Sequence, residues 1–165
     1  MNNSIYLGGG CFWCIESVYK KVNGIISISP GYMGGDTHNP TYEEVCEGYT
    51  NHVEVVKLDY NEIITLDQIL NIFFTVHDPT SINRQGADVG TQYRSAIFCK
   101  QDERSFIVNF IQELESQNIF SDKIVTEVND IQKFYIAEDY HHDYFTKNPE
   151  TVSYTHLTLP TIVSV

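Results

Sequence analysis

Three consecutive glycines, Gly8 to Gly10, stand directly before Cys11, between a run typical of a strand and a run typical of a helix. Glycine lets the backbone turn tightly, so the strand expected over residues 4–7 ends there and a helix over residues 12–21 can follow. Cys11 then lies in the first helical turn, where unpaired N–H groups and the positive end of the helix dipole favour the reactive thiolate. A buried structural thiol is the commonest alternative for a free cysteine, but three glycines are an unusual setting for a core residue. The segment therefore predicts a redox nucleophile at Cys11.

Strand and helix patterns interleave along the rest of the chain. Alternating apolar side chains predict strands over residues 25–29, 53–60, 95–99 and 123–128, and helical spacing predicts helices from Thr65 to Phe74, over 102–116 and over 137–145. Residues 30–40 and 79–92 are polar and are expected to be loops, the second long enough to be functional. We therefore expect one domain over residues 1–150 of the α+β class, an α/β two-layer sandwich. Its mixed β-sheet would carry packed helices around a split βαβ, ferredoxin-like core.

The composition and charge of the chain limit its possible binding partners and its cellular compartment. A net charge of −12 over 165 residues repels phosphate backbones and anionic lipid, so we expect no nucleic acid and no membrane as partners. No stretch approaches the roughly 20 apolar residues that span a bilayer, and the first residues lack the basic and apolar pattern of a secretory signal. Four cysteines are too few for a disulfide scaffold. We expect a cytoplasmic monomer.

Cys14 completes a Cys-x-x-Cys segment with Cys11. In a reducing compartment that spacing suits a reversible disulfide or one half of a zinc site. A zinc site needs a second pair of ligands, whereas Cys46 and Cys99 are single and far apart, so we expect no metal. The segment alone also fits a thiol–disulfide oxidoreductase that acts directly on protein disulfides. The intervening aromatic residues could form an apolar cup for a methyl group or pack the helix on the sheet; the pattern leaves both open.

Several segments resemble one known family in its own order along residues 4–149. They are Gly10-Cys11-Phe12-Trp13, Tyr32-Met33-Gly34-Gly35, Asn39-Pro40-Thr41-Tyr42-Glu43-Glu44-Val45-Cys46, Asn51-His52-Val53-Glu54-Val55-Val56, His77-Asp78-Pro79-Thr80, Asn83-Arg84-Gln85-Gly86, Asp88, Gly90-Thr91-Gln92-Tyr93-Arg94-Ser95, Ala137-Glu138-Asp139-Tyr140-His141 and Lys147-Asn148-Pro149. The family is the A-type peptide methionine sulfoxide reductases. The resemblance implies reduction of the S epimer of methionine sulfoxide, in oxidised proteins and as the free amino acid, with no bound cofactor.

The resemblance also implies a role for each matched residue. The sulfur of Cys11 would attack the sulfoxide sulfur and become a sulfenic acid, a step on the known oxidation ladder of cysteine. Glu54 would be the general acid, although strand alternation by itself leaves open whether its side chain faces solvent. Tyr42 and Tyr93 would bind the sulfoxide oxygen, and Phe12 and Trp13 would bind the methyl group of the substrate. Asp88 would position the substrate or the hydrogen bonds of the site.

Recycling of the sulfenic acid is the last implication. Family members use a resolving cysteine and then thioredoxin, for which dithiothreitol substitutes in vitro. We expect Cys14 to resolve Cys11, and Cys46 and Cys99 to be buried structural thiols. Residues 151–165 depart from the family pattern and carry no charged side chain, so we expect a non-family tail that is a sequence artefact. A native C-terminus with a further cysteine would be the rival of Cys14.

Overall fold

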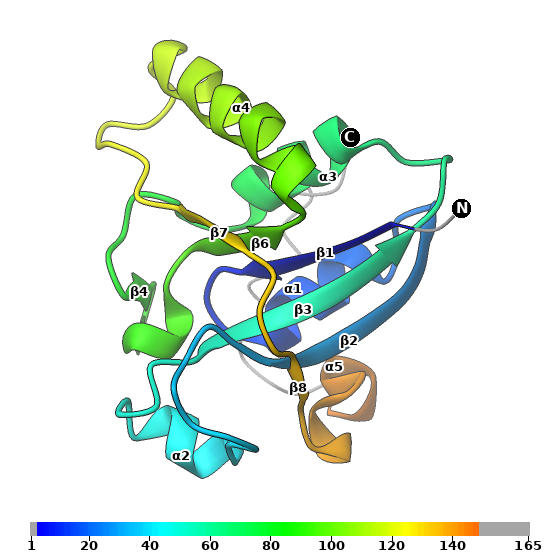
Figure 1. Cartoon of the computed structure of the whole chain (residues 1–165), viewed down its shortest axis with the longest axis vertical. Coiled ribbons are helices and arrows are strands. Elements are labelled where there is room, and N and C mark those ends of the chain that lie inside the picture. Colours follow the sequence, from blue (N-terminus) through cyan, green and yellow to red (C-terminus); the bar gives the residue numbers. More distant parts are fainter. Residues whose placement is uncertain (1–2, 149–165) are drawn as a thin grey trace.

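The computed structural model describes residues 3–148, and these form a mixed sheet with helices packed on it (Figure 1). Within this part of the chain a six-stranded sheet has the order β7-β6-β1-β3-β2-β8. Its strands are β1 (Asn3–Gly8), β2 (Ile25–Met33), β3 (Val53–Tyr60), β6 (Ala96–Cys99), β7 (Glu127–Asp130) and β8 (Tyr135–Ile136). Neighbouring strands are antiparallel except β6 and β7, which are parallel.

The order of the four central strands gives the expected split βαβ arrangement. Strands β1 and β2 both pair antiparallel with β3, so they run parallel to each other, and helix α1 (Phe12–Tyr19) connects them. Strands β3 and β6 likewise flank β1, and helix α3 (Leu66–Val76) lies between them in the chain. Two interleaved βαβ units of this kind make a ferredoxin-like core, which confirms the predicted α+β class.

The two faces of the sheet have different coverings. On one face, Ile5 and Leu7 of β1 pack with Val56 and Leu58 of β3 beneath α1 and α3, together with α4 (Arg104–Ser116). Because side chains alternate along a strand, the residues between them point to the other face. There, a smaller cluster that includes Tyr6 is covered by Phe134, in the segment that crosses the sheet between β7 and β8 (Figure 1).

Helix α3 shows how closely local sequence can determine an element. Thr65 caps the helix by accepting a hydrogen bond from the backbone N–H of Gln68, and the Gln68 side chain accepts one from Thr65 N–H. This reciprocal pair satisfies two backbone donors at the helix start. Leu70 and Phe73 are fully buried on the face that the helical spacing predicts.

The predicted loop over residues 30–40 is wrong at its start, because β2 continues through Pro30 to Met33. Pro30 cannot donate a backbone hydrogen bond, but its carbonyl oxygen accepts one from Ala137 N–H at 2.9 Å. Gly31 then pairs with Ile136 of β8, and a Cβ at Gly31 would collide with the ring of Phe134. Pairing with β3 through Met33, together with the shorter pairing with β8, therefore extends the strand beyond its β-branched residues.

The predicted loop over residues 79–92 and the predicted strand over 123–128 also need correction. The loop contains a short hairpin, β4 (Arg84–Gln85) and β5 (Asp88–Val89), and leads into a 3₁₀ turn, η1 (Thr91–Tyr93). Strand β7 starts only at Glu127, because Val125 N–H binds the carbonyl of Pro79 instead of a neighbouring strand. Another 3₁₀ turn, η2 (Gln101–Glu103), precedes α4.

The single helix predicted over residues 137–145 is also wrong. A 3₁₀ turn, η3 (Asp139–His141), and a four-residue helix, α5 (Tyr144–Lys147), are separated by Asp143, whose φ of 58° lies in the left-handed region. A regular right-handed helix cannot pass through that conformation. The proposed tail over residues 151–165 lies outside the described residues. No helix within residues 3–148 has the length and apolarity needed to cross a bilayer.

Candidate active site

Cys11 is the N-cap residue of α1, at the point where the chain leaves β1. Gly10 has a φ of 87°, a left-handed conformation that favours glycine, and its N–H donates to the carbonyl of Tyr93 at 3.1 Å. Cys14 N–H in turn donates to the carbonyl of Cys11 at 3.1 Å. The glycine run therefore fixes the nucleophile between the start of α1 and the loop that ends in η1.

The surroundings of Cys11 oppose the ionisation of its thiol. A hydrogen bond with the Cys14 thiol, burial, and the nearby Glu54 carboxyl together raise the pKa of Cys11 well above its ordinary value. The backbone N–H of Trp13 acts in the opposite direction, as expected at a helix start, but does not prevail. At this helix start, the hydrogen bond with Cys14 and burial therefore influence the pKa of Cys11 more than the Trp13 N–H does.

Glu54 points into the protein and not to solvent. It lies on the helix-covered face of β3 directly across from Tyr32 of β2, and it is 0% exposed. Its Oε1 accepts a hydrogen bond from Phe12 N–H at 3.2 Å, whereas Oε2 is buried with no hydrogen-bond partner among the described residues. Burial raises the pKa of Glu54 to about 8, against the weaker effect of the Phe12 N–H. At neutral pH the carboxyl is therefore protonated and can donate a proton.

Tyr42, Tyr93 and Asp88 lie near Glu54 and come from two separate segments of the chain, the second of which holds both Asp88 and Tyr93. Tyr42 opens α2 (Tyr42–Cys46), which a capping box between Thr41 and Glu44 starts. Tyr93 ends η1, and Asp88 lies on β5. Burial, followed by the charge of Glu54, raises the pKa of both tyrosines, so their hydroxyls remain donors at all physiological pH values. Burial also raises the pKa of Asp88.

The two aromatic residues after Cys11 have different surroundings. Phe12 is fully buried, with ring centroids 5.6 Å from Tyr32 and 5.0 Å from His141. Trp13 is half-buried, and its indole stacks face to face on the ring of Tyr144 with centroids 3.6 Å apart. Phe12 therefore packs α1 on the sheet, whereas Trp13 is more open to solvent. Both rings contact Tyr42, and these three side chains are called the aromatic wall.

The other three cysteines differ in their exposure. Cys14 is half-buried beside Cys11, and Cys99 is buried in the main core, as expected for a structural thiol. Cys46 is exposed, so the expectation of a buried structural thiol is wrong. Helix α2 buries Val45, and the next residue points about 100° away from that face. The Cys46 thiol instead makes a hydrogen bond with Tyr42.

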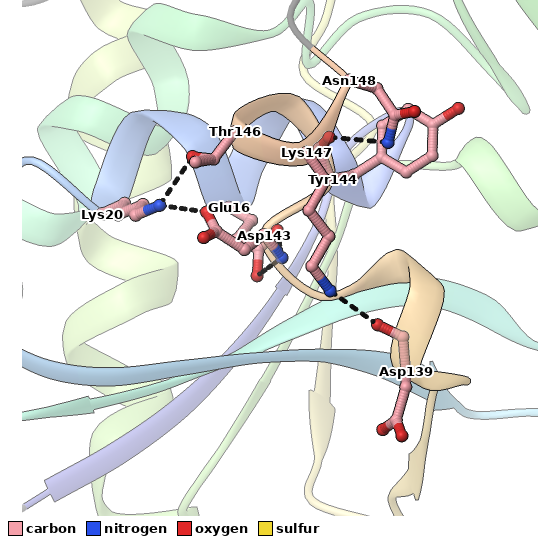
Figure 2. A network of polar contacts seen from close by, with 8 residues as sticks. All are labelled: Glu16, Lys20, Asp139, Asp143, Tyr144, Thr146, Lys147 and Asn148. Atoms are coloured by element: carbon pink, nitrogen blue, oxygen red, sulfur yellow. Dashed lines mark hydrogen bonds and ion pairs between the residues drawn. The ribbon is translucent and has the colours of Figure 1, made fainter.

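The C-terminal segment is fixed against α1 by polar contacts (Figure 2). Both carboxylate oxygens of Glu16 accept from Asp143 N–H, at 2.9 and 3.0 Å, and Lys20 pairs with the Asp143 carboxylate and the Thr146 hydroxyl. Glu16 is 6% exposed, and burial raises its pKa. These contacts hold α5 where Tyr144 covers the indole of Trp13.

Two residues near the site, Glu138 and His141, carry no role in the sequence analysis. They occur in the matched segment Ala137-Glu138-Asp139-Tyr140-His141, and this match is the signal that could have identified them. The structure places both next to the aromatic wall, through contacts with Tyr42 and Trp13. Within residues 3–148, no three His, Cys, Asp or Glu side chains are grouped so that they could hold a metal ion.

Comparisons with known proteins agree with this geometry. The family model described as peptide methionine sulfoxide reductase matches residues 3–163. The peptide methionine sulfoxide reductase MsrA of Trichodesmium erythraeum is 51% identical over 151 residues, covering 90% of this chain and 85% of that protein. The crystal structure of reduced Mxr1 from Saccharomyces cerevisiae matches with a TM-score of 0.84 and 37% identity, covering 91% of this chain and 87% of Mxr1.

A second yeast structure shows Mxr1 in complex with Trx2, with a TM-score of 0.60 and 25% identity over 87% of this chain and 84% of Mxr1. The match of the family model to nearly the whole chain and the identity to MsrA proteins lead to one conclusion. The chain belongs to the peptide methionine sulfoxide reductase family, type A, and is an enzyme that reduces methionine sulfoxide.

Proposed function

We propose that the enzyme reduces the S epimer of methionine sulfoxide, protein-bound or free, through a sulfenic acid on Cys11. The buried, protonated Glu54 beside Cys11 is the observation that carries the proposal. The S–O bond of the sulfoxide breaks and an S–O bond forms on the Cys11 sulfur. The substrate sulfur gains two electrons and the Cys11 sulfur loses two. The thiol proton ends on the sulfenic oxygen, while Glu54 lends its proton to the departing oxygen and recovers it.

The surrounding side chains would orient the substrate for this step. The hydroxyls of Tyr42 and Tyr93 are permanent donors and would bind the sulfoxide oxygen. Phe12 and Trp13 supply an apolar wall for the methyl group. Asp88, whose charge acts on both Glu54 and Tyr93, would position the hydrogen bonds of the site.

Recycling would follow through Cys14 and thioredoxin. The Cys14 thiol attacks the sulfenic sulfur of Cys11, a disulfide forms and one water molecule leaves. A dithiol of thioredoxin then reduces the disulfide and is itself oxidised. The hydrogen bond between the two thiols supports the first step, and the Trx2 complex of yeast Mxr1 supports the second. A cytoplasmic, monomeric enzyme without a bound cofactor stays a prediction.

The stereochemical part of the proposal can be tested with separated epimers. We expect turnover of a peptide containing the S sulfoxide with dithiothreitol as reductant, and at most about 1% of that rate with the R sulfoxide, because a single arrangement of acid and methyl wall fits one epimer. Release of methionine-containing peptide, followed by chromatography, measures both rates. Equal turnover of the two epimers, or turnover of R alone, would overturn the assignment.

The resolving role of Cys14 predicts a specific disulfide. After one equivalent of sulfoxide substrate without reductant, peptide mapping should show a Cys11–Cys14 link and no free sulfenic acid. In Cys14→Ser, the first turnover should persist and the sulfenic acid should accumulate, trapped by dimedone. A Cys11–Cys46 link in the wild-type enzyme would instead identify the exposed Cys46 as the resolving residue.

A further inference from the structure

We propose that His141 and Glu138 are positioning residues. They hold the methyl-binding indole of Trp13 at a fixed position relative to the oxygen-binding Tyr42. The inference rests on the proposed roles of Trp13 and Tyr42. It adds a function for His141, at the end of η3, and for Glu138, the N-cap residue of η3, neither of which the proposed mechanism uses.

His141 lies at the centre of the aromatic wall. Its side chain is 0% exposed, and its ring centroid lies 5.0 Å from Phe12, 5.7 Å from Trp13 and 4.4 Å from Tyr42. It therefore contacts three of the four aromatic residues that the proposed mechanism places around the sulfoxide, all except Tyr93. A change in the position of this ring would move the methyl-binding and oxygen-binding groups relative to each other.

A hydrogen bond defines the orientation of the indole. Trp13 Nε1–H donates to His141 Nδ1 at 2.9 Å. Because the indole nitrogen is a donor only, Nδ1 must be the unprotonated nitrogen and Nε2 carries the hydrogen. Burial lowers the pKa of His141, so the ring is neutral at physiological pH and keeps its acceptor. Phenylalanine or leucine could fill the same space but could not accept this bond.

Glu138 connects the histidine to Tyr42. Its Oε2 accepts from Tyr42 N–H at 2.9 Å, its Oε1 accepts from the Tyr32 hydroxyl at 2.9 Å, and the same Oε1 lies 3.7 Å from His141 Nε2. Although burial opposes ionisation, the Tyr42 N–H and the Tyr32 hydroxyl help to hold the pKa of Glu138 below its usual value. The carboxylate thus faces the Nε2–H, which has no hydrogen-bond partner among the described residues.

Together these contacts form a connection across the site that consists of two hydrogen bonds and, between them, a 3.7 Å approach of His141 Nε2 to Glu138 Oε1 that is too long for a hydrogen bond. It runs from the indole of Trp13 through the imidazole of His141 and the carboxylate of Glu138 to the first backbone N–H of α2. The Glu16–Asp143 contacts of Figure 2 fix α5 independently, so Tyr144 covers one face of the indole whatever stands at position 141. The role of His141 can therefore be separated from the docking of the C-terminal segment.

The test compares two nearly isosteric variants, His141→Asn and His141→Leu. The side-chain oxygen of asparagine takes the place of Nδ1 and can accept from the indole, whereas leucine cannot. In steady-state reduction of an S-sulfoxide peptide with dithiothreitol, we expect about a tenfold higher KM for His141→Leu. Its kcat should stay within about threefold of wild type, because the change disturbs a surface that binds the substrate in the ground state. His141→Asn should recover most of the KM.

Fluorescence gives a readout that activity does not affect. Trp13 is the only tryptophan of the chain, so its emission reports this indole alone. We expect red-shifted emission and stronger acrylamide quenching in His141→Leu, and values near wild type in His141→Asn. A merely structural histidine would give the same change in both variants, and equal KM and equal emission would overturn the proposal.

Glu138→Gln tests the contacts of Glu138 with Tyr42 and His141. It also keeps the proposal testable if neither His141 variant folds. Glutamine keeps an oxygen for the Tyr32 hydroxyl but loses the charge and one acceptor. We expect a several-fold fall in kcat/KM and increased acrylamide quenching of Trp13, whereas wild-type values of both would refute the link. Glu54→Gln distinguishes this failure from a failure of the proposed function, because its kcat/KM should fall by about 10²–10⁴-fold while its Trp13 emission stays unchanged.

Discussion

Replacing Cys11 with serine is expected to abolish sulfoxide reduction, with a loss on the order of 10⁶-fold in kcat/KM, because the covalent route disappears. A serine hydroxyl has nearly the same size but cannot accept oxygen from a sulfoxide and form a sulfenic acid. The N-cap position of residue 11 should be preserved, because serine is a favourable N-cap residue. Chromatographic detection of reduced peptide, with dithiothreitol in excess, measures the residual rate.

Cys99→Ala is the matched control for this prediction. Cys99 is 1% exposed in the main core, and the charged groups that act on it, Glu103, Arg104, Asp130 and Asp102, have no role in the proposed mechanism, so its removal should leave kcat/KM within about twofold. Substantial turnover by Cys11→Ser would contradict the proposal that Cys11 is the nucleophile. Cys14 or Cys46 would then be the candidate nucleophile.

Replacing Glu54 with glutamine should lower kcat/KM by about 10²–10⁴-fold, the usual range for a lost acid catalyst. Glutamine can still accept the Phe12 N–H through its side-chain oxygen, so the start of α1 should not move. A thiol–disulfide oxidoreductase would need no acid at this position. Retention of full sulfoxide reductase activity by Glu54→Gln, measured in single turnover, would therefore exclude the proposed acid.

The pH dependence of the wild-type enzyme follows from the same carboxyl. Because burial raises its pKa to about 8, Glu54 holds its proton at pH 6–7 and loses it at higher pH. The single-turnover rate should therefore fall as the pH rises through about 8. Rate measurements from pH 6 to 9 check this, and a rate that increases steadily across the range would contradict a protonated Glu54.

Glu54→Gln should also be more stable than the wild type at neutral pH. The unfolded chain ionises this carboxyl near 4.5, whereas the folded protein keeps it protonated to about 8. The stability of the neutral form is therefore complete below about pH 4.5 and is lost progressively as the pH rises toward 8. Thermal melting at pH 4.5 and pH 7.5 should show a stability advantage of the variant only at the higher pH. A variant that is inactive yet more stable would separate catalysis from folding.

Local sequence determined most of the elements and the family of this protein. The glycine run before Cys11, the alternation over Val53–Tyr60 and the capping box at Thr65 each specify a local conformation, and the structure confirms all three. These signals depend on neighbours along the chain, and they suffice for the α+β class. The matched motifs then identified the family, together with the residues that could take part in the reaction.

Only the tertiary structure decided which way the Glu54 side chain faces. Strand alternation allows either face of the sheet, and pairing with β2 and covering by α1 bury the face on which Glu54 lies. It also showed which neighbours raise the pKa of Cys11, since the hydrogen bond with Cys14, burial and the nearby Glu54 cannot be read from a helix start. Likewise, the connection from Trp13 through His141 and Glu138 to Tyr42 joins residues more than 90 positions apart. The glycine run and Cys11 were visible in the sequence, but the proton and the binding wall that the reaction needs come from contacts that exist only in the folded chain.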